Sequence, residues 1–446
     1  MLRWPRSNAA SPTCSWIMSS STDAVAVLDA AYAARSPIDD PLGRAAAAYR
    51  LAVAVGESTP ADHRRALRLL DEARGVLTEA RAPLEHGRIL TAAASQYRGL
   101  SEPVRAAELF EQAAQLLDER AGPEERAAAW SNVGLARSEL GRFGEAVDAF
   151  DRASAVLASP RSAQRSNESA RVHATVLINR GLALFGLGRF ADARADLEAG
   201  LVGVDVNTAP VQTGMAHHSL GQLATAEDRR ADAIAHFTAA LQVFTATSFP
   251  QQHAVTTFNL GVAHAGGDEL AELRRALWYF EATANLFDPR SQAEQWRQAA
   301  ARLGDVTRRL ADLDPRRTQA EHRAALLGSV SDDERLPLMR ALVERFAARP
   351  DPQRTDAFHE AAAAVSDTPD VEARSILRTA LFVLAELPDP VVRAALTGQL
   401  RAHAGLSVPE RFVADSTLDQ LIQELFQGPQ RVRFRDVLYE LGWERP

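Results

Sequence analysis

Histidine is the side chain whose spacing in this sequence first suggests chemistry. Five of the 11 histidines lie close together along the chain, at His217, His218, His236, His253 and His264. Imidazole can ligate a metal ion or act as a general base. The zinc motif HExxH is absent, however, and the HEAAAA segment at 359–364 lacks the second histidine. We therefore expect His217 to pack in a core or an interface, and we predict no metal site, cofactor or catalytic residue.

Lysine is missing from the whole sequence, so all 50 basic side chains are arginine. This excludes a P-loop lysine, a protein-kinase lysine and a Schiff-base lysine. Neither a GxSxG nor a GxGxxG motif is found, and Cys14 is the only cysteine, which excludes an internal disulfide and a cysteine-rich zinc site. The sequence therefore predicts a protein that is not an enzyme, and its cysteine content fits the reducing cytoplasm.

Asparagine occurs three times two residues before a glycine within apolar, helix-like segments. The three pairs are Asn132/Gly134, Asn179/Gly181 and Asn259/Gly261. Because asparagine is a poor helix former, its repeated presence in a helix interior indicates a structural or binding reason.

These pairs belong to an internal repeat. Small residues recur at positions 54, 94, 134, 181, 221 and 261, so four of the five intervals are 40 residues and one is 47. Around Gly134, Trp130 lies four residues before, Ala146 twelve after and Phe150 sixteen after, and the other copies follow this spacing. With 46% hydrophobic but only 6% aromatic residues, the composition favours helices that pack through small side chains. We predict an all-α fold of helix-turn-helix units.

This spacing, with the turns ELGRF and GLGRF between the two halves, resembles the tetratricopeptide (TPR) repeat over about residues 40–312. The period of about 40 residues is similar to that of kinesin-light-chain-like and spindle-adaptor-like TPR proteins. The resemblance implies a right-handed superhelical solenoid of about six helix-turn-helix repeats. Residues 291–313 continue the helical period and are expected to form a capping helix.

In the long-repeat adaptors that the chain resembles, asparagines two residues before the small residue bind the backbone of an extended peptide in a concave groove. Asn132, Asn179 and Asn259 match this position, whereas the fifth copy has the shorter polar residue Ser219 there. The neighbouring offsets add His218, Gln222 and Phe258 to the predicted groove, and Arg88 and Arg98 add a basic spot that could receive a carboxylate. In the alternative interpretation, the asparagines only tie adjacent repeats together through their own backbones.

The repeat also predicts the domain organisation. We expect residues 1–22 to be disordered, with Met18 as an alternative start, residues 23–330 to form the solenoid with its cap, and residues 331–446 to form a helical domain of five or six helices. Residues 157–172 contain serine, proline and asparagine and are predicted to be a loop. No apolar run is long enough to span a membrane, and the net charge of −8 comes without a basic stripe for nucleic acid.

Three functions are compatible with these features. The first is a cytoplasmic scaffold or adaptor that binds a protein or an extended peptide in the TPR groove, with no nucleic-acid or membrane partner. The second is a regulator, as in bacterial long-repeat sensors, that changes shape on binding a peptide and releases a partner. The third is an accessory subunit of an enzyme or assembly, with its site in the C-terminal domain.

Overall fold

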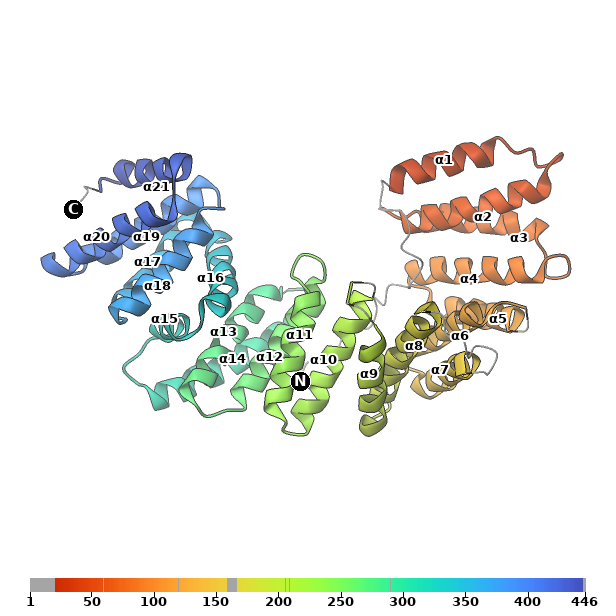
Figure 1. Ribbon diagram of the computed structural model, residues 1–446, viewed down its shortest axis with the longest axis horizontal. Helices are drawn as coiled ribbons and strands as arrows, with labels where there is room; N and C mark the ends of the chain where they lie inside the picture. The colour runs from red at the N-terminus through yellow and green to blue at the C-terminus, as the bar shows by residue number, and fades with distance from the viewer. Residues whose placement is uncertain are drawn as a thin grey trace. The chain divides into compact units, whose positions relative to one another are not determined.

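A computed structural model of the chain describes residues 21–58, 60–118, 120–158, 167–204, 206–207, 209–288 and 290–443. This described part forms 21 α-helices and no strand, which confirms the predicted all-α fold (Figure 1). Of the segment predicted to be disordered, residues 1–20 lie outside the described residues, and residues 21 and 22 already belong to the first helix. Among the described helices, none combines the length and the apolar character that crossing a membrane requires.

The chain divides into two compact units, one that ends at Thr256 and one that begins at Thr257. In the first unit, ten helices form five consecutive hairpins, α2–α3, α4–α5, α6–α7, α8–α9 and α10–α11 (Figure 1). Its helices are α1 (Ser21–Ala33), α2 (Pro41–Glu57), α3 (His63–Val76), α4 (Pro83–Gly99), α5 (Pro103–Leu117), α6 (Pro123–Glu139), α7 (Phe143–Ala158), α8 (Asn167–Gly186), α9 (Phe190–Gly203), α10 (Pro210–Ala226), α11 (Arg230–Val243) and the first part of α12 (Pro250–Ala265).

Proline sets the start of most first helices in these hairpins. Helices α2, α4, α6 and α10 each carry proline at the first or second helical position, where its fixed φ suits the helix and its missing N–H costs no hydrogen bond. Helix α2 is also capped by Asp40, whose Oδ1 accepts a hydrogen bond from the backbone N–H of Gly43 at 2.9 Å. Local sequence therefore favours the start of four of the five hairpins.

The repeated glycines hold the two helices of a hairpin together. A Cβ on Gly134 would lie 2.6 Å from the ring of Phe150, and a Cβ on Gly221 would lie 2.7 Å from the ring of Phe237. A Cβ on Gly181 would lie 2.8 Å from Leu197. Real Cβ contacts are never this short, so only glycine lets the second helix approach this closely. The predicted pairing of a small residue with a bulky one sixteen residues later is confirmed in these hairpins.

The turn inside the hairpin is also repeated. Seven residues after the small residue, four hairpins place a residue in the left-handed region, at Ser101 (φ 61°), Gly141 (φ 75°), Gly188 (φ 78°) and Asp228 (φ 58°). Glycine adopts this conformation freely, whereas serine and aspartate pay a steric cost. The turns in α4–α5 and α10–α11 thus keep the same backbone shape without glycine, which shows that the shape is imposed by the packing of the two helices.

The second unit contains the rest of α12 and nine further helices. They are α13 (Leu270–Leu286), α14 (Ala293–Leu313), α15 (Gln319–Ser329), α16 (Asp332–Ala347), α17 (Asp351–Ser366), α18 (Asp370–Leu384), α19 (Asp389–Ala404), α20 (Val408–Leu425) and α21 (Gly428–Glu440). Helices α13 and α14 still pack as neighbours, and α14 is the helix predicted to cap the repeats.

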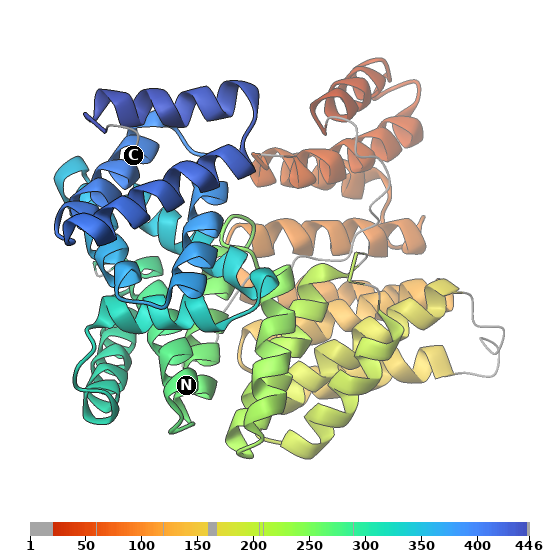
Figure 2. The same cartoon turned by 60° about the vertical axis from the view of Figure 1, so that its left-hand side comes forward.

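From α15 onward the packing changes. Each helix packs mainly on the helix two positions later in the chain. As a result, α15, α17, α19 and α21 form one row, and α16, α18 and α20 form another. Figure 2 shows these C-terminal helices from a second direction, in colours that run from cyan to blue. The six helices after residue 331 agree with the predicted five or six, and their apolar core lies between the two rows.

A buried charge cluster joins α13 to the two rows. Glu281 on α13 accepts hydrogen bonds from Arg323 on α15 at 2.7 Å and from Arg345 on α16 at 3.1 Å. All three side chains are at most 14% exposed. Arg323 also contacts the exposed Glu360 at 3.3 Å. Burial lowers the pKa of Arg345 from its usual value, and the Glu281 carboxylate opposes this effect.

One sequence-based expectation, the extent of the predicted loop, changes at this level. Helix α8 begins at Asn167, inside the predicted 157–172 loop, where Ser169 on its first turn donates a hydrogen bond to Glu124 of α6 at 2.9 Å. Residues 159–166 lie outside the described part. The sixth repeat, with Gly261 packed against Phe280, belongs to the same compact unit as the C-terminal helices, and Trp278 lies in their core. The predicted division of the chain after residue 330 stays a prediction, as does the right-handed superhelix.

Candidate functional site

The candidate site is a stripe along the first helices of the hairpins in the first unit. On α6 the stripe consists of Ala128, Asn132, Leu135 and Glu139, which are partly or fully exposed, while Val133, Gly134 and Ala136 are buried. These residues follow one another at intervals of three or four, which places them on one helix face. Because α6 contacts α8 and α8 contacts α10, the stripes of these helices are adjacent.

Two asparagines of the predicted ladder lie in this stripe. Asn132 on α6 is partly exposed, and Asn179 at the same repeat position on α8 is 5% exposed. Within the described part of the chain, neither side-chain amide forms a hydrogen bond. An amide in a helix interior without a partner loses the hydrogen bonds that water would give it. The alternative in which these asparagines tie adjacent repeats together through hydrogen bonds is therefore not realised at Asn132 or Asn179.

The row is already enclosed at α8. Ser219 and Gln222 on α10 are 6% and 8% exposed, close to the value for Asn179, and Gln222 takes part in a polar interaction. Asn259 is 1% exposed, also has an interaction partner and belongs to the second compact unit. The structure thus brings Asn132 and Asn179 together on neighbouring helices, whereas the ligand contacts proposed for the other three residues stay predictions.

His218 and Phe258 were expected to line the open groove, and the structure corrects this. Each is 2% exposed. The ring of His218 packs edge-on against Phe237 at 5.6 Å, and Phe258 packs against Phe280 at 5.5 Å. A residue three positions before the small residue lies roughly 60° from it around the helix, whereas a residue two positions before lies roughly 160° away. The two offsets therefore lie about 100° apart around the helix, and only the second points away from the packed small residue.

The predicted basic spot is neutralised within the protein. Arg88 donates two hydrogen bonds to Glu125 of α6, at 2.7 and 2.9 Å, and this contact raises the pKa of Arg88 further. Arg98 lies 3.9 Å from Glu139, and burial raises the pKa of that carboxyl above its usual value while the arginine opposes the shift. Both arginines thus link α4 to α6, so the stripe does not present an unpaired positive charge at either position.

The histidines that suggested chemistry lie in packed surroundings. His217 on α10 and His236 on α11 bring their Nδ1 atoms to 3.2 Å, and burial together with the neighbouring ring lowers the pKa of His217. Burial also lowers the pKa of His236. Across the described residues, no group of three histidine, cysteine, aspartate or glutamate side chains is arranged to hold a metal ion.

His218 should make the stability of the first unit depend on pH. Burial lowers the pKa of His218 to about 3, and its Nδ1 lies 2.9 Å from Oγ1 of Thr256. Since the folded pKa is below the value of 6.5 in the unfolded chain, the unfolded state binds the proton first as the pH falls. The stability is therefore fully present above pH 6.5 and decreases towards pH 3.

Between pH 7.5 and 5, this residue should account for a loss of about 2 kcal/mol in the free energy of unfolding. Urea unfolding of the wild type and of His218→Gln at both pH values measures it, because the remaining titrating groups are common to both proteins. An identical pH dependence in the two proteins would show that the pKa of His218 is the same in the folded and unfolded states, which would contradict its burial.

One further feature was not anticipated from the sequence. An apolar cavity of about 80 Å³ lies among the C-terminal helices, with Gln399 in its wall. The lining residues come from helices that pack on the helix two positions later in the chain. A helical pattern in the sequence shows which face is buried but not which helix covers it, so the cavity could not be predicted. A lone glutamine between apolar positions of α19 was the only signal available.

Comparison with known proteins adds a weak structural likeness. No family model matches the chain, and no curated protein matches it. The crystal structure of BtubC (BKLC) from P. vanneervenii is similar with a TM-score of 0.37 and 15% sequence identity, over 57% of this chain and 93% of that chain. A likeness of this size supports no conclusion about function, which is therefore argued from the stripe itself.

Proposed function

We propose that the first unit is a TPR-like, non-catalytic scaffold that binds an extended protein segment along the stripe of α6 and α8. The observation that carries the proposal is the pair of asparagines, Asn132 and Asn179, at the same repeat position on adjacent helices. Neither amide has a hydrogen-bond partner among the described residues. Each amide offers a donor and an acceptor, which is what a peptide group requires.

The spacing of the helices suits an extended chain. Adjacent packed helices lie about 8–10 Å apart, and an extended chain advances about 3.3 Å per residue. One amide would therefore meet the ligand backbone at about every third residue. Recognition through backbone groups gives affinity without strict sequence selectivity, as in other proteins that bind extended segments.

The other side chains of the stripe indicate the kind of segment. Ala128 and Leu135 on α6 and Leu182 on α8 are uncharged. The charged Glu139 lies 3.9 Å from Arg98, and Arg88 is already paired with Glu125. An acidic segment would find no free arginine there, so the ligand should contact the stripe with apolar or uncharged side chains. The role as a regulator that changes shape on binding stays a prediction, and so does a cytoplasmic location.

A displayed library of unstructured peptides tests the proposal. A peptide selected on the wild-type protein should bind about fivefold more weakly to Asn132→Ala, and about as much more weakly to Asn179→Ala, because each substitution removes about 1 kcal/mol of hydrogen bonding. Isothermal titration calorimetry of the purified peptide measures both effects.

Asn207→Ala is the matched control, because Asn207 is an exposed asparagine of the same unit that lies outside the stripe. Its peptide affinity should equal that of the wild type. Equal affinity of all variants for the peptide would refute the ladder. A loss of binding that is accompanied by an equal loss of thermal stability would show that the asparagines serve the fold.

A further inference from the structure

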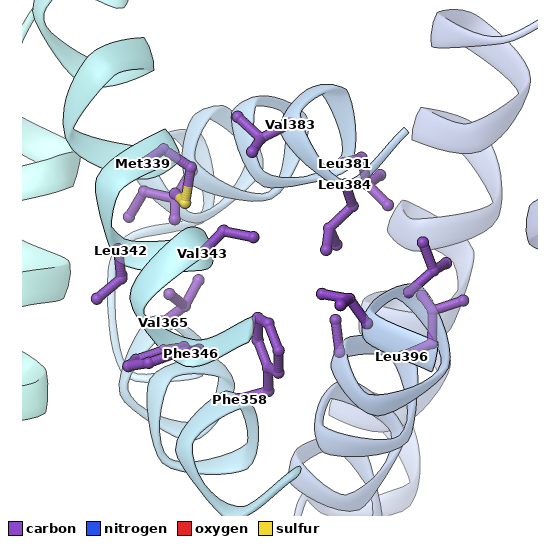
Figure 3. Packing of buried hydrophobic residues seen from close by; sticks show 14 of the residues in the cluster. Met339, Leu342, Val343, Phe346, Phe358, Val365, Leu381, Val383, Leu384 and Leu396 are labelled. Carbon is purple, nitrogen blue, oxygen red and sulfur yellow. The ribbon is translucent and has the colours of Figure 1, made fainter. Parts of the chain in front are cut away.

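The C-terminal helices line a partly open cavity with room for a small molecule. It has a volume of about 80 Å³ and lies between the two rows of helices, with walls from α15 to α20. Figure 3 shows the side chains around this space, with Met339, Val343, Phe346 and Phe358 on one side and Leu384 and Leu396 on the other. A single water molecule needs about 10–15 Å³, so the space is several times larger than one water requires.

The walls of the cavity are almost entirely apolar. Apart from Arg323 and Gln399, every lining side chain is aliphatic, aromatic or methionine. Ordered water in a protein interior makes two to four hydrogen bonds, and apolar cavities of this kind stay dry and accept apolar ligands. Side chains that face the cavity have no atoms to contact there. A bound apolar molecule would supply these missing dispersion contacts.

Arg323 does not offer its charge to a ligand. Its guanidinium is held by Glu281 at 2.7 Å and by Glu360 at 3.3 Å. A ligand with a negative charge would have to compete with two carboxylates for this arginine. The cavity therefore disfavours fatty acids and other anions.

Gln399 is oriented by a chain of hydrogen bonds behind the wall. Nδ1 of the buried His403 lies 2.7 Å from Oδ1 of Asp415, and Nε2 of His403 lies 2.8 Å from Nε2 of Gln399. The carboxylate can only accept, so Nδ1 of His403 carries the proton that it donates to Asp415. In the neutral ring Nε2 is then an acceptor, and the amide nitrogen of Gln399 donates to it.

This arrangement leaves the other atom of the amide available. Within the described part of the chain, Oε1 of Gln399 has no hydrogen-bond partner. Since the nitrogen is directed to His403, the oxygen is the group that Gln399 can offer to the cavity that it lines. The wall thus combines one hydrogen-bond acceptor with an otherwise apolar surface.

We propose that this cavity binds a small, mainly apolar, uncharged molecule that carries one hydrogen-bond donor, which it gives to Oε1 of Gln399. Asp415 and His403 are positioning residues: they fix the tautomer of the imidazole and thereby keep the oxygen of Gln399 as the atom available to the ligand. This binding site is independent of the stripe on the first unit.

Indole and benzofuran form a matched pair of probes, because the two molecules have the same ring skeleton. Indole carries an N–H donor where benzofuran has an oxygen atom, which cannot donate. Isothermal titration calorimetry of the full-length protein should show binding of both. Replacing the amide in Gln399→Leu should weaken indole relative to benzofuran by about tenfold, the value of one neutral hydrogen bond. An unchanged ratio of the two affinities would overturn the assignment of Gln399.

A second variant tests the cavity itself. Ala324 is buried and lines the space, and Ala324→Leu should fill part of it and abolish binding of both probes. Circular dichroism and thermal unfolding establish that this variant is folded. If it is not, the ratio measured with Gln399→Leu still decides the proposal. Failure of the wild type to bind either probe at millimolar concentration would refute the cavity site.

The role of His403 has a spectroscopic signature. A ¹⁵N spectrum of the imidazole should show a protonated Nδ1 and an unprotonated Nε2 at neutral pH, both without ligand and with indole bound. The opposite tautomer would place the amide oxygen of Gln399 on His403 and would contradict the proposed donor preference.

Discussion

Replacing Glu281 by alanine is expected to lower the free energy of unfolding of the second unit by about 3–5 kcal/mol. Glu281 accepts hydrogen bonds from Arg323 and Arg345, and all three side chains are almost fully enclosed by α13, α15 and α16. Without the carboxylate, two guanidinium groups would remain close together in a setting that already lowers the pKa of Arg345. Removing one partner of a buried ion pair costs far more than the pair itself contributes, because the remaining charge is left without compensation.

Hydrogen exchange on α13, α15 and α16, together with urea unfolding, measures this effect. Glu360→Ala is the control, because Glu360 contacts the same Arg323 with a side chain that is 61% exposed, and exposed pairs contribute about 0–1 kcal/mol. If Glu281→Ala were as mild as Glu360→Ala, the cluster would be hydrated in solution and would not hold α13 to the helices that follow.

Phe237→Ala is expected to destabilise the first unit by about 3–5 kcal/mol. The ring of Phe237 is fully buried between α10 and α11. It fills the space above Gly221, and it also forms an edge contact with His218. Truncation would leave a cavity that the rigid hairpin cannot close, so the loss should exceed the transfer free energy of the ring. Urea unfolding followed by circular dichroism gives the free energy directly.

Phe190→Ala provides the comparison within the same unit, since Phe190 is 46% exposed at the start of α9. Its cost should stay below about 1 kcal/mol. A double-mutant cycle adds specificity: Gly221→Ala places a methyl group against the ring of Phe237, and Phe237→Leu removes the ring atoms in its way. The double variant should lose less stability than the sum of the two single variants. Strict additivity would mean that Gly221 and Phe237 are not coupled in the packing.

The hairpins of the first unit could be predicted because the residues that pack together in each hairpin lie close to one another in the sequence. Gly134 and Phe150, or Gly221 and Phe237, recur at one distance along the chain, and their contact is local to one hairpin. The second unit offers no such signal. There α17 packs mainly on α19 and α16 on α18, and the helical pattern of each segment identifies an apolar face but not the helix that covers it.

The ligand contacts of the candidate site stay a prediction, but helix geometry accounts for where several of its residues lie. Asn132 and Asn179 lie on the stripe because their offset points away from the packed glycine. His218 and Phe258, one residue earlier in their repeats, turn into the core. Arg88 and Arg98 were expected to serve a ligand, but their partners Glu125 and Glu139 lie in the next repeat. Which arginine finds a carboxylate depends on the contact between neighbouring repeats, and a single sequence does not display that contact.

The left-handed turn shared by Ser101, Gly141, Gly188 and Asp228 makes the first unit modular. Residues 102–141 and residues 189–228 are blocks of 40 residues that each begin just after such a turn residue and end on the next one. Such a block could be removed or duplicated, and the chain would rejoin with the same backbone geometry at the junction. Each exchange would shorten or lengthen the row of first helices by one helix, so the length of segment that the scaffold accommodates could change in whole steps without any new loop.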